Sequence, residues 1–278
     1  MDAAESLRVM TFNLRHHREE RLGWHARREA VQDVARRHQP DILGTQEGLL
    51  PQLLDLREVL PHHDIVGEAR RGGEEDEFVA IFYDARKFDA EESGNFWFSD
   101  TPDVPGSMHW GNYVPRMTTW ARLRSRETGA RFLFVNTHLD HFHPRARTRG
   151  ARMLAERFPA SVGDPMLLVG DFNSLPRRFV HKLLTRENGF EDAFHIAHER
   201  SHRFGGSFHG FTGRGLMRLD WILCRPRWEV RRHVTVRDRP MGIHPSDHFP
   251  VLAEMRMPAS AESALADPAP EDVFAVAA

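Results

Sequence analysis

Cysteine, lysine and long apolar runs are nearly absent from this sequence. Cys224 is the only cysteine among 278 residues, so no disulfide can form within the chain. No segment approaches the roughly 20 apolar residues of a membrane-spanning helix, and residues 1–8 lack the apolar run of a signal peptide. We therefore expect a cytoplasmic protein without a membrane span, unless a signal peptide has already been removed.

The charged residues show no global excess of either sign. The net charge is −2 with neutral histidines, and Lys87 and Lys182 are the only lysines. We interpret the abundance of arginine as a compositional bias and not as phosphate recognition. One local basic run is expected to spread around its helix and not to form a stripe: Arg145, Arg147, Arg149 and Arg152. Proteins that bind duplex DNA usually carry a basic surface, so the composition argues against that partner.

Short apolar segments alternate with amphipathic ones through most of the chain. Apolar, β-branched or aromatic runs predict strands at residues 9–14, 41–45, 78–83, 132–138 and 166–169. Helical spacing predicts helices at residues 24–38, 49–60 and 145–158. The first of these helices would have an inner face of small apolar residues: Ala26, Ala30, Val34 and Ala35. This alternation suggests a two-sheet core flanked by helices.

The last part of the chain differs in composition from the rest. Residues 258–278 are rich in alanine, proline, serine and acids, with too little apolar surface to order themselves, which predicts a flexible tail. No internal repeat or linker interrupts residues 1–257. We expect those residues to form a single domain, because the polar residues discussed below come from its whole length and must converge.

The strongest chemical signal is Gly170-Asp171-Phe172-Asn173, directly after an apolar run. Residues two apart in an extended segment face the same side, so Asp171 and Asn173 present a carboxylate and a carboxamide together. Such a pair suits phosphate hydrolysis, in which the carboxylate orients or deprotonates water and the amide donates to a phosphoryl oxygen. The alternative is an Asx turn that only ends the strand, and the motif alone does not separate the two.

Two further acids, Asp247 and Asp220, are candidate partners of a histidine. Asp247 and His248 are adjacent, and an imidazole beside a carboxylate can donate to the negative charge of a transition state. An isolated Asp-His pair is, however, more often part of a surface loop. Asp220 lies among apolar neighbours, and a buried carboxylate needs a partner. Orienting an imidazole is one common role of such an acid.

Four more polar residues follow strand ends, where a rigid sheet can present a site: Asn13, Glu47, His138 and Asp140. The oxygen ligands of Asn, Asp and Glu favour Mg²⁺ or Mn²⁺. Zinc is disfavoured despite 18 histidines, because the sequence has one cysteine and no His-Glu-x-x-His motif. Two pairs of adjacent histidines are interpreted as surface residues and not as ligands: His16, His17, His62 and His63.

The polar residues described above resemble, in their order along the chain, the signature of the endonuclease/exonuclease/phosphatase superfamily. These residues are Asn13, Glu47, His138, Asp171 with Asn173, Asp220, and Asp247 with His248. The resemblance spans residues 9–251. It implies an α/β fold, a four-layer α/β/β/α sandwich of two packed mixed β-sheets flanked by helices, with the site at the top of the sheets. It also implies a divalent-metal-dependent phosphoester hydrolase, either a phosphodiesterase or a phosphatase. We expect it to be a monomer.

The resemblance assigns four of these residues to the metal and the attacking water, and a fifth to the phosphate. It implies that Glu47 is the principal metal ligand, with Asn13 beside it. Asp247 would complete or support the metal shell. Asp171 would activate the attacking water, and Asn173 would bind the phosphate.

The remaining residues are assigned to the phosphate and the leaving group. The resemblance implies that His248, held by Asp220, donates to the phosphoryl oxygen and that His138 contacts the phosphate or the leaving side. Segments at residues 115–120, 137–141 and 207–211 are most similar to a bacterial subgroup of uncertain substrate, and they also resemble the deadenylase branch. Four residues are candidate substrate contacts: Arg116, Asp140, Arg147 and His209.

Two charged residues leave alternatives open. Arg147 either binds phosphate as a bidentate donor or forms an ion pair on a helix face. Glu77 ends an acidic segment and either points into the site or belongs to a solvated loop, and we favour the solvated loop.

Three kinds of protein could have this fold: an enzyme acting on a small phosphate ester, a nuclease, and a non-catalytic binding protein. A phosphodiesterase or phosphatase acting on a small molecule and a nuclease acting on DNA or RNA share this core, so the motifs do not separate them. A non-catalytic binding protein of the same fold is disfavoured, because such a protein would be expected to have replaced Glu47, Asp171 or His248, and all three are present.

Overall fold

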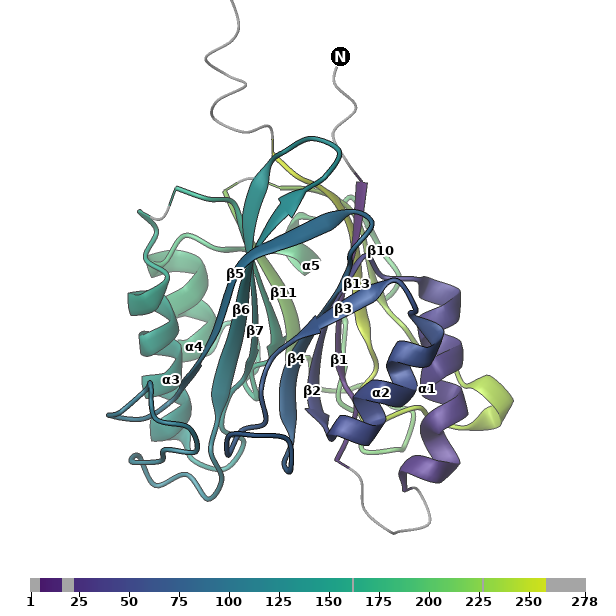
Figure 1. Ribbon diagram of the computed structural model, residues 1–278, viewed down its shortest axis with the longest axis horizontal. Helices are drawn as coiled ribbons and strands as arrows, with labels where there is room; N and C mark the ends of the chain where they lie inside the picture. The colour runs from purple at the N-terminus through teal and green to yellow at the C-terminus, as the bar shows by residue number, and fades with distance from the viewer. Residues whose placement is uncertain (1–5, 17–22, 162, 227, 259–278) are drawn as a thin grey trace, which may run out of the picture.

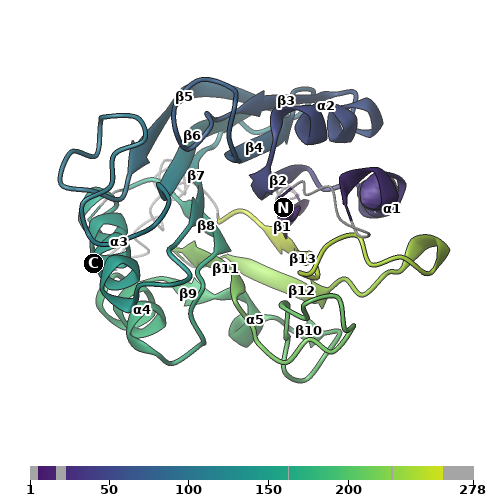
Figure 2. The same ribbon diagram turned by 90° about the horizontal axis from the view of Figure 1, so that it is seen from below.

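The computed structural model describes residues 6–16, 23–161, 163–226 and 228–258. These residues form two mixed β-sheets that pack face to face, with helices over the outer face of each sheet (Figure 1; Figure 2). The α/β/β/α sandwich that the sequence implied is therefore confirmed. The flexible tail predicted at residues 258–278 lies outside the described residues, apart from Pro258.

The strands of the described residues are divided between the two sheets. The larger sheet has seven strands in the order β10 (Glu199–Arg200), β12 (Glu229–Thr235), β13 (Val251–Arg256), β1 (Ser6–Asn13), β2 (Ile42–Gly48), β4 (Phe78–Asp84) and β3 (His63–Val66). The smaller sheet has six strands in the order β5 (Phe88–Trp97), β6 (Met117–Ser125), β7 (Arg131–His138), β8 (Met166–Asp171), β11 (Asp220–Arg225) and β9 (Glu191–Asp192).

The helices cover the two outer faces. α1 (Trp24–His38) and α2 (Leu50–Val59) pack on the seven-stranded sheet. α3 (Pro144–Arg157), α4 (Phe179–Lys182) and the π-helical turn η1 (Leu183–Glu187) pack on the six-stranded sheet, on the opposite side of the molecule (Figure 2). α5 (Ala193–Ile196) and the 3₁₀ turn η2 (Pro240–Gly242) are short. None of the helices in the described segments is long and apolar enough to cross a membrane.

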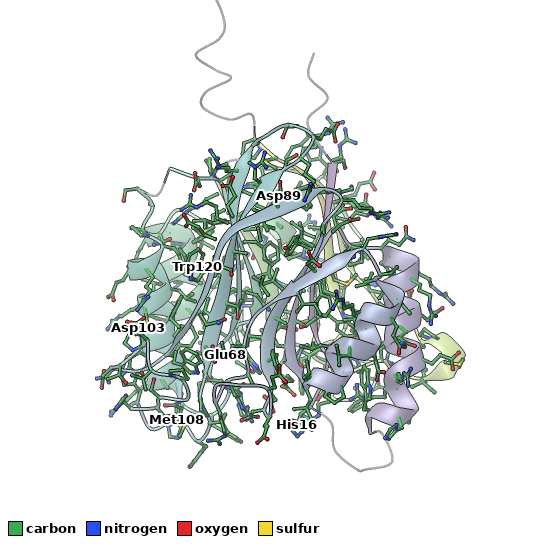
Figure 3. All side chains as sticks on the ribbon, viewed as in Figure 1. His16, Glu68, Asp89, Asp103, Met108 and Trp120 are labelled. Carbon is green, nitrogen blue, oxygen red and sulfur yellow. The ribbon has the colours of Figure 1, made fainter. Side chains whose placement is uncertain are left out.

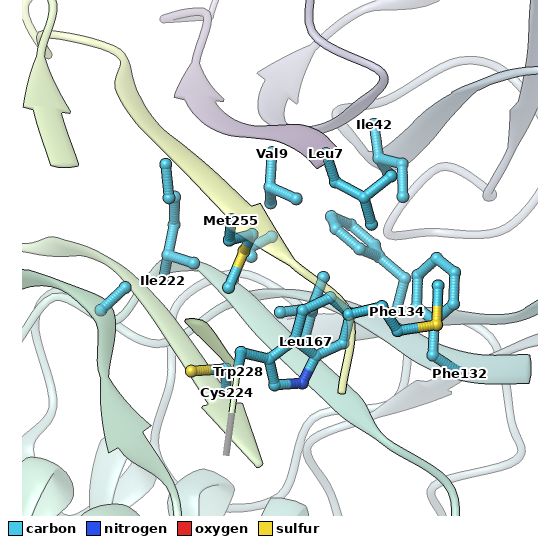
Figure 4. Packing of buried hydrophobic residues seen from close by; sticks show 14 of the residues in the cluster. Leu7, Val9, Ile42, Phe132, Phe134, Leu167, Ile222, Cys224, Trp228 and Met255 are labelled. Atoms are coloured by element: carbon cyan, nitrogen blue, oxygen red, sulfur yellow. The ribbon is translucent and has the colours of Figure 1, made fainter. Parts of the chain in front are cut away.

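Alternation along the central strands fills two apolar layers at once. In β1, Leu7 and Val9 face the other sheet, whereas Met10 and Phe12 face α1 and α2. Strands that are buried on both faces carry nearly continuous apolar runs, which explains why β1 is recognisable in the sequence. Figure 4 shows the layer between the sheets, to which both sheets contribute, among others, Val9, Ile42, Phe134, Leu167 and Ile222.

The end of β2 differs from the prediction in a way that matters for the site. The sequence predicted a strand that stops at residue 45, with Glu47 in the following loop, but β2 continues to Gly48. Its pairing with β4 shifts between Thr45 and Gly48, and Glu47 has a φ of 62°. Such a bulge re-aims a side chain within a strand. Glu47 is therefore fixed by the sheet itself.

One charged residue takes a core position on α1. Ala26 is exposed, contrary to its predicted place on the inner face, and Arg27 is fully buried. A buried guanidinium needs acceptors, and Nη1 of Arg27 donates to the carbonyl oxygens of Leu14 (2.9 Å) and Pro245 (2.6 Å). These bonds tie the end of β1 to the segment that leads to Asp247.

The histidine pairs are not uniformly at the surface. His62 is exposed as predicted, but His63 is buried, with Nε2 2.8 Å from the carbonyl oxygen of Pro40. Burial lowers the pKa of His63, so its neutral ring is a hydrogen-bonded part of the core. His16 is partly buried beside the site described below, and His17 lies outside the described residues.

Candidate active site

Strand register brings five polar side chains to one end of the two sheets. β7 and β8 are parallel and place His138 opposite Asp171, while β8 and β11 are antiparallel and place Asp220 opposite Asp171. In the other sheet, Asn13 and Glu47 lie at the ends of the parallel strands β1 and β2. Figure 2 looks onto this end of the molecule, and Figure 3 labels His16, which follows β1 there.

Asn13 connects the two halves of the site across the interface between the sheets. Its Nδ2 donates to Oε1 of Glu47 (3.0 Å) and to Oδ2 of Asp171 (3.2 Å) in the opposite sheet. Asn13 is fully buried, and its Oδ1 accepts the N–H of Arg15 (3.0 Å). The amide therefore fixes the separation between the two carboxylates.

Glu47 is held as a carboxylate. Burial raises its pKa, but hydrogen bonds from the backbone N–H of His16 to Oε2 (3.0 Å) and from Nδ2 of Asn13 outweigh burial and lower the pKa to about 2. An ionised carboxylate has lone pairs left for a hard cation. Glu47 is thus charged and oriented as a metal ligand needs to be.

Asp171, Asp220 and His248 form a buried cluster. Nδ1 of His248 lies 2.8 Å from Oδ2 of Asp220, and Nε2 lies 3.8 Å from Oδ2 of Asp171. Burial lowers the pKa of His248, but the charges of Asp220 and Asp171 raise it to about 10. Burial and the charge of Asp220 raise the pKa of Asp171 to about 7. The imidazole is therefore a charged donor, and Asp171 is a stronger base than an ordinary aspartate.

Asn173 forms an Asx turn with Asp171 and also faces the cavity described below. Its backbone N–H donates to Oδ1 of Asp171 (2.9 Å), with φ at 47°, and its Nδ2 donates to the carbonyl oxygen of Leu139 (3.0 Å). The turn and the chemical motif are thus the same structure, because the turn that ends β8 also orients the acid and the amide.

Asp247 faces Glu47 across the guanidinium of Arg15. Nη1 of Arg15 lies 3.5 Å from Oδ2 of Asp247 and 4.0 Å from Oε2 of Glu47. The side chains of Glu47 and Asp247 offer carboxylate oxygens, and this donor set fits Mg²⁺ or Mn²⁺. Asn13 lies alongside, but it directs Nδ2 to Glu47, while its Oδ1 accepts the N–H of Arg15. The ligand atoms of the cluster around His248 also lie within 4.8 Å of one another, but a charged imidazole has no free lone pair for a metal.

His138 lies between the cavity and a buried arginine. Its Nε2 is 3.7 Å from Oδ2 of Asp171. Nη1 of Arg116 lies 2.9 and 3.0 Å from the two ring nitrogens of His138, and Nη2 lies 2.5 Å from Nδ1 of His141. Burial and the charge of Arg116 lower the pKa of His138 well below its ordinary value. His138 is therefore neutral, and Arg116 lies behind it, outside the lining of the main cavity.

Two of the predicted substrate contacts, Asp140 in the loop before α3 and Arg147 on α3, have different positions relative to the cavity. Oδ1 of Asp140 accepts the N–H groups of Phe142 (2.8 Å) and His143 (2.5 Å), so Asp140 shapes the turn and does not line the cavity. Arg147 does line the cavity, and its Nη1 donates to the carbonyl oxygen of Asp140 (2.6 Å). The position of Arg147 is thus compatible with phosphate binding.

His209 lies outside the lining of the cavity. Its ring stacks on Phe249 with centroids 3.9 Å apart, and its Nδ1 accepts the N–H of Gly213 (3.3 Å). These contacts make His209 a support of the segment around His248 and place it away from a direct substrate contact.

The cavity at this end of the sheets has a volume of about 970 Å³. Among its lining residues are seven that the sequence singled out: Glu47, His138, Arg147, Asp171, Asn173, Asp247 and His248. Sequence reasoning missed Arg15, Arg178 and Phe179, which also line it. Arg15 lies two residues after Asn13, and this spacing could have indicated it, whereas no local pattern marks the other two.

Glu77 is buried, contrary to the solvated loop predicted for it. Its Oε1 is 2.9 Å from Nδ1 of His16, and its Oε2 accepts from Nη1 of Arg70 (2.6 Å). The backbone N–H of His16 binds Glu47, so Glu77 supports the metal-ligand candidate from behind.

A second buried acid, Asp192, forms an ion pair outside the cavity. Arg218 donates from Nη1 to Oδ1 (3.0 Å) and from Nη2 to Oδ2 (2.6 Å), and Nε2 of His181 lies 2.8 Å from Oδ2. Ligand atoms of Asp192, His181 and His195 lie within 4.8 Å of one another. Because the guanidinium holds both carboxylate oxygens, the cluster is a structural ion pair and not a metal site.

Replacing Asp192 by asparagine is expected to lower the free energy of unfolding by about 2 kcal/mol at neutral pH, as the loss of charge-assisted hydrogen bonds does. Burial raises the pKa of Asp192, but His181 and Arg218 outweigh burial and lower it below its ordinary value. A lowered carboxyl pKa stabilises the fold above the unfolded pKa, and this contribution is lost on acidification. The difference between variant and wild type should therefore shrink below about pH 4.

Urea denaturation at neutral and acidic pH measures this difference. The matched control is Glu191→Gln, which changes the neighbouring, only partly buried acid and should cost little. A loss for Asp192→Asn that is equal at both pH values would contradict the ion-pair account.

Comparison with known proteins finds matches that cover most of the chain. The Endonuclease/Exonuclease/phosphatase family model matches residues 10–248. A solved endonuclease/exonuclease/phosphatase family protein from Bacteroides thetaiotaomicron is 33% identical, covers 92% of this chain and 99% of its own, and has a TM-score of 0.85. A mannosyl-6-phosphatase from Bacteroides thetaiotaomicron VPI-5482 is 33% identical, over 90% of this chain and 100% of its own, with a TM-score of 0.84. An uncharacterized protein of Acanthamoeba polyphaga mimivirus is 27% identical over 161 residues, which span 54% of this chain and 59% of the viral protein.

Proposed function

The chain belongs to the endonuclease/exonuclease/phosphatase family, and on that premise we propose that it is a phosphoester hydrolase that depends on Mg²⁺ or Mn²⁺. One arrangement carries the proposal: the ionised Glu47, the basic Asp171 and the charged His248 all line one cavity. A metal ligand, a general base and a donor for developing charge are the three groups that such a hydrolysis needs.

Asp171 accepts the proton of the attacking water in this proposal. A carboxylate with a pKa of about 7 is suited to general-base catalysis near neutral pH. Asn173 and Asn13 hold its two oxygens, so the base stays aimed into the cavity. The cation, when bound beside Glu47 and Asp247, supplies Lewis-acid polarisation of the phosphoryl group.

His248 donates from Nε2 to a phosphoryl oxygen as negative charge develops there. Asp220 holds Nδ1 of the same ring and stabilises its positive charge. Arg15 and Arg147 line the cavity and supply positive charge for the phosphate. His138 is neutral and lies within reach of Asp171, where it contacts the phosphate or the leaving group.

The substrate is a phosphate ester of a small molecule in this proposal. The volume of about 970 Å³ is that of a cavity for a small organic ligand. The net charge of −2 does not favour a long polyanion. One neighbour at 33% identity is a mannosyl-6-phosphatase, which supports a compact substrate for this chain as well.

A panel of phosphomonoesters, phosphodiesters, DNA, RNA and phospholipids, tested with Mg²⁺ and with Mn²⁺, should show hydrolysis mainly of small phosphate esters. Duplex DNA should bind weakly, with a shallow salt dependence, since that slope counts neutralised phosphates. Tight duplex binding at physiological salt with a steep slope would favour the nuclease alternative. Binding without hydrolysis of any ester would instead favour the non-catalytic one.

A further inference from the structure

A second cavity, of about 480 Å³, adjoins the first along α3. Pro144 and Thr148 line both cavities, so the two share a wall. The rest of the second cavity is mostly basic and aromatic, and it is lined by His109, Trp110, Arg145, Arg149 and Arg152.

The three arginines form a stripe on α3, which corrects the expectation that this basic run spreads around the helix. Arg145, Arg149 and Arg152 are spaced by four and three residues, so at 3.6 residues per turn they fall within about 60° of arc. Arg147 points away from them, into the first cavity. The chain thus concentrates positive charge at one place despite its near-neutral total.

These arginines are exposed, and within the described residues none of them forms an ion pair with a carboxylate. Arg157 on the same helix, by contrast, pairs with Asp103 (3.0 Å). The guanidinium groups of Arg149 and Arg152 instead lie over aromatic rings, those of Trp110 (5.6 Å) and Phe179 (5.4 Å) respectively. Their polar edges are therefore available to a ligand.

Two neighbouring features add to the positive potential and to the rigidity of this cavity. α3 begins at Pro144 with no side-chain cap and no acid in its first turn. The positive end of the helix dipole favours anions there, and Oδ1 of Asp140 accepts the N–H of His143 directly before the helix. Trp110 is fixed by a hydrogen bond from its Nε1 to Oδ1 of Asp100 (2.8 Å).

We propose that the second cavity binds a second phosphate group of the substrate while the first cavity holds the phosphate that is hydrolysed. This inference rests on the proposed function. Guanidinium groups bind phosphate oxygens in a bidentate fork. Pro144 and Thr148 border both cavities, so the two phosphates of one molecule would lie on either side of these residues. The second phosphate comes either from a bisphosphorylated small molecule or from an adjacent nucleotide, whose base would stack on Trp110.

The test compares substrates that differ by one phosphate. Glucose 6-phosphate and glucose 1,6-bisphosphate represent the small-molecule source. Thymidine 5′-(p-nitrophenyl phosphate), with and without a 3′-phosphate, represents the nucleotide source. The wild type should have a kcat/KM about tenfold higher for the bisphosphorylated member of at least one pair, as a charge-assisted contact provides. That preference should decline with ionic strength.

In the double variant Arg149→Gln/Arg152→Gln, the ratio of kcat/KM for the bisphosphorylated substrate to kcat/KM for the monophosphorylated one should fall to about one. The monophosphorylated substrate serves as the internal reference. The matched control is Arg36→Gln, an exposed arginine on α1, on the opposite side of the molecule (Figure 1). Thermal melts verify that each variant is folded. A wild type without preference in either pair, or a preference that survives in the double variant, would overturn the proposal.

Calorimetric binding keeps this outcome separate from the proposed function. In a His248→Ala background, the Arg149→Gln/Arg152→Gln substitutions should weaken the binding of glucose 1,6-bisphosphate, or of the 3′-phosphorylated thymidine ester, about tenfold. If no ester is hydrolysed, the proposed function fails, yet this measurement still decides whether the second cavity binds phosphate. Affinity that is unchanged by the two substitutions would count against the second site alone.

Discussion

EDTA is expected to abolish the hydrolysis of phosphate esters by this protein, and Mg²⁺ or Mn²⁺ is expected to restore it. Glu47 is partly buried and ionised, with a pKa of about 2, and it faces Asp247 across the guanidinium of Arg15. Without a cation at these carboxylates, the charge that develops on the phosphate loses its strongest stabilisation. Initial rates in a metal-stripped sample, titrated with each ion, measure the effect. Full activity in EDTA would contradict the assignment of the whole site.

Glu47→Gln tests the ligand apart from the reaction. The variant removes the charge and keeps one acceptor oxygen, which can serve the N–H of His16 or Nδ2 of Asn13 but not both. Its melting temperature without metal should stay within a few degrees of the wild type, whereas the increase on adding Mg²⁺ should disappear, because a ligand stabilises only the state that binds it. The matched control is Glu29→Gln, on the exposed face of α1. A metal-induced increase equal to that of the wild type would show that Glu47 is not the ligand.

The local sequence pattern was sufficient to locate a strand wherever both faces of that strand are apolar. β1 and β8 were located from such runs, and α1 was located with its bounds, because each buries enough apolar surface to mark itself in the sequence. The bulge at Glu47 could not be predicted in this way, because it arises from pairing with β4, about thirty residues further along the chain. The two-residue strands β9 and β10 are likewise defined only by their partners.

The site was predictable where a motif coincides with a strand end. Asp171 ends β8 and Asp220 begins β11, so order along the chain and register in the sheet carry the same information. Which side chains reach the cavity is a tertiary property. Arg116 lies behind His138, while Arg15 faces the cavity and Glu77 is buried by its partners. Only the position of Arg15, two residues after Asn13, is indicated by the local sequence, whereas those of Arg116 and Glu77 depend on their tertiary partners.

The stripe on α3 is a different case, because helical spacing alone contains it. Arg145, Arg149 and Arg152 fall on one face by arithmetic on their numbers, and only Arg147 lies elsewhere. Because the four arginines were treated as one group spread around the helix, the concentration of positive charge on one face was missed. The net charge of the chain therefore does not describe the local charge of one helix face, which has to be considered separately.

His248→Ala is expected to lower kcat by about a hundredfold or more, as the loss of a positioned donor typically does. The donor is needed more in the transition state than in the ground state, so KM should change little. His62→Ala, an exposed histidine far along the chain, is the matched control and should leave both constants unchanged. His248→Ala also leaves Asp220 buried without its partner, so thermal melts must accompany the kinetics. A kcat close to that of the wild type would exclude His248 as the donor.

Asp220→Asn then separates a positioning role from a structural one. An amide oxygen can still accept from Nδ1 of His248 but stabilises its positive charge less, so kcat should fall by about tenfold, or about 1.4 kcal/mol of transition-state stabilisation. If the two residues act as one unit, the double variant should be little worse than His248→Ala alone, because effects within such a unit are not additive. If Asp220 is only a buried structural acid, Asp220→Asn should instead lower the melting temperature and leave turnover of the folded fraction near normal. The losses in the double variant would then multiply.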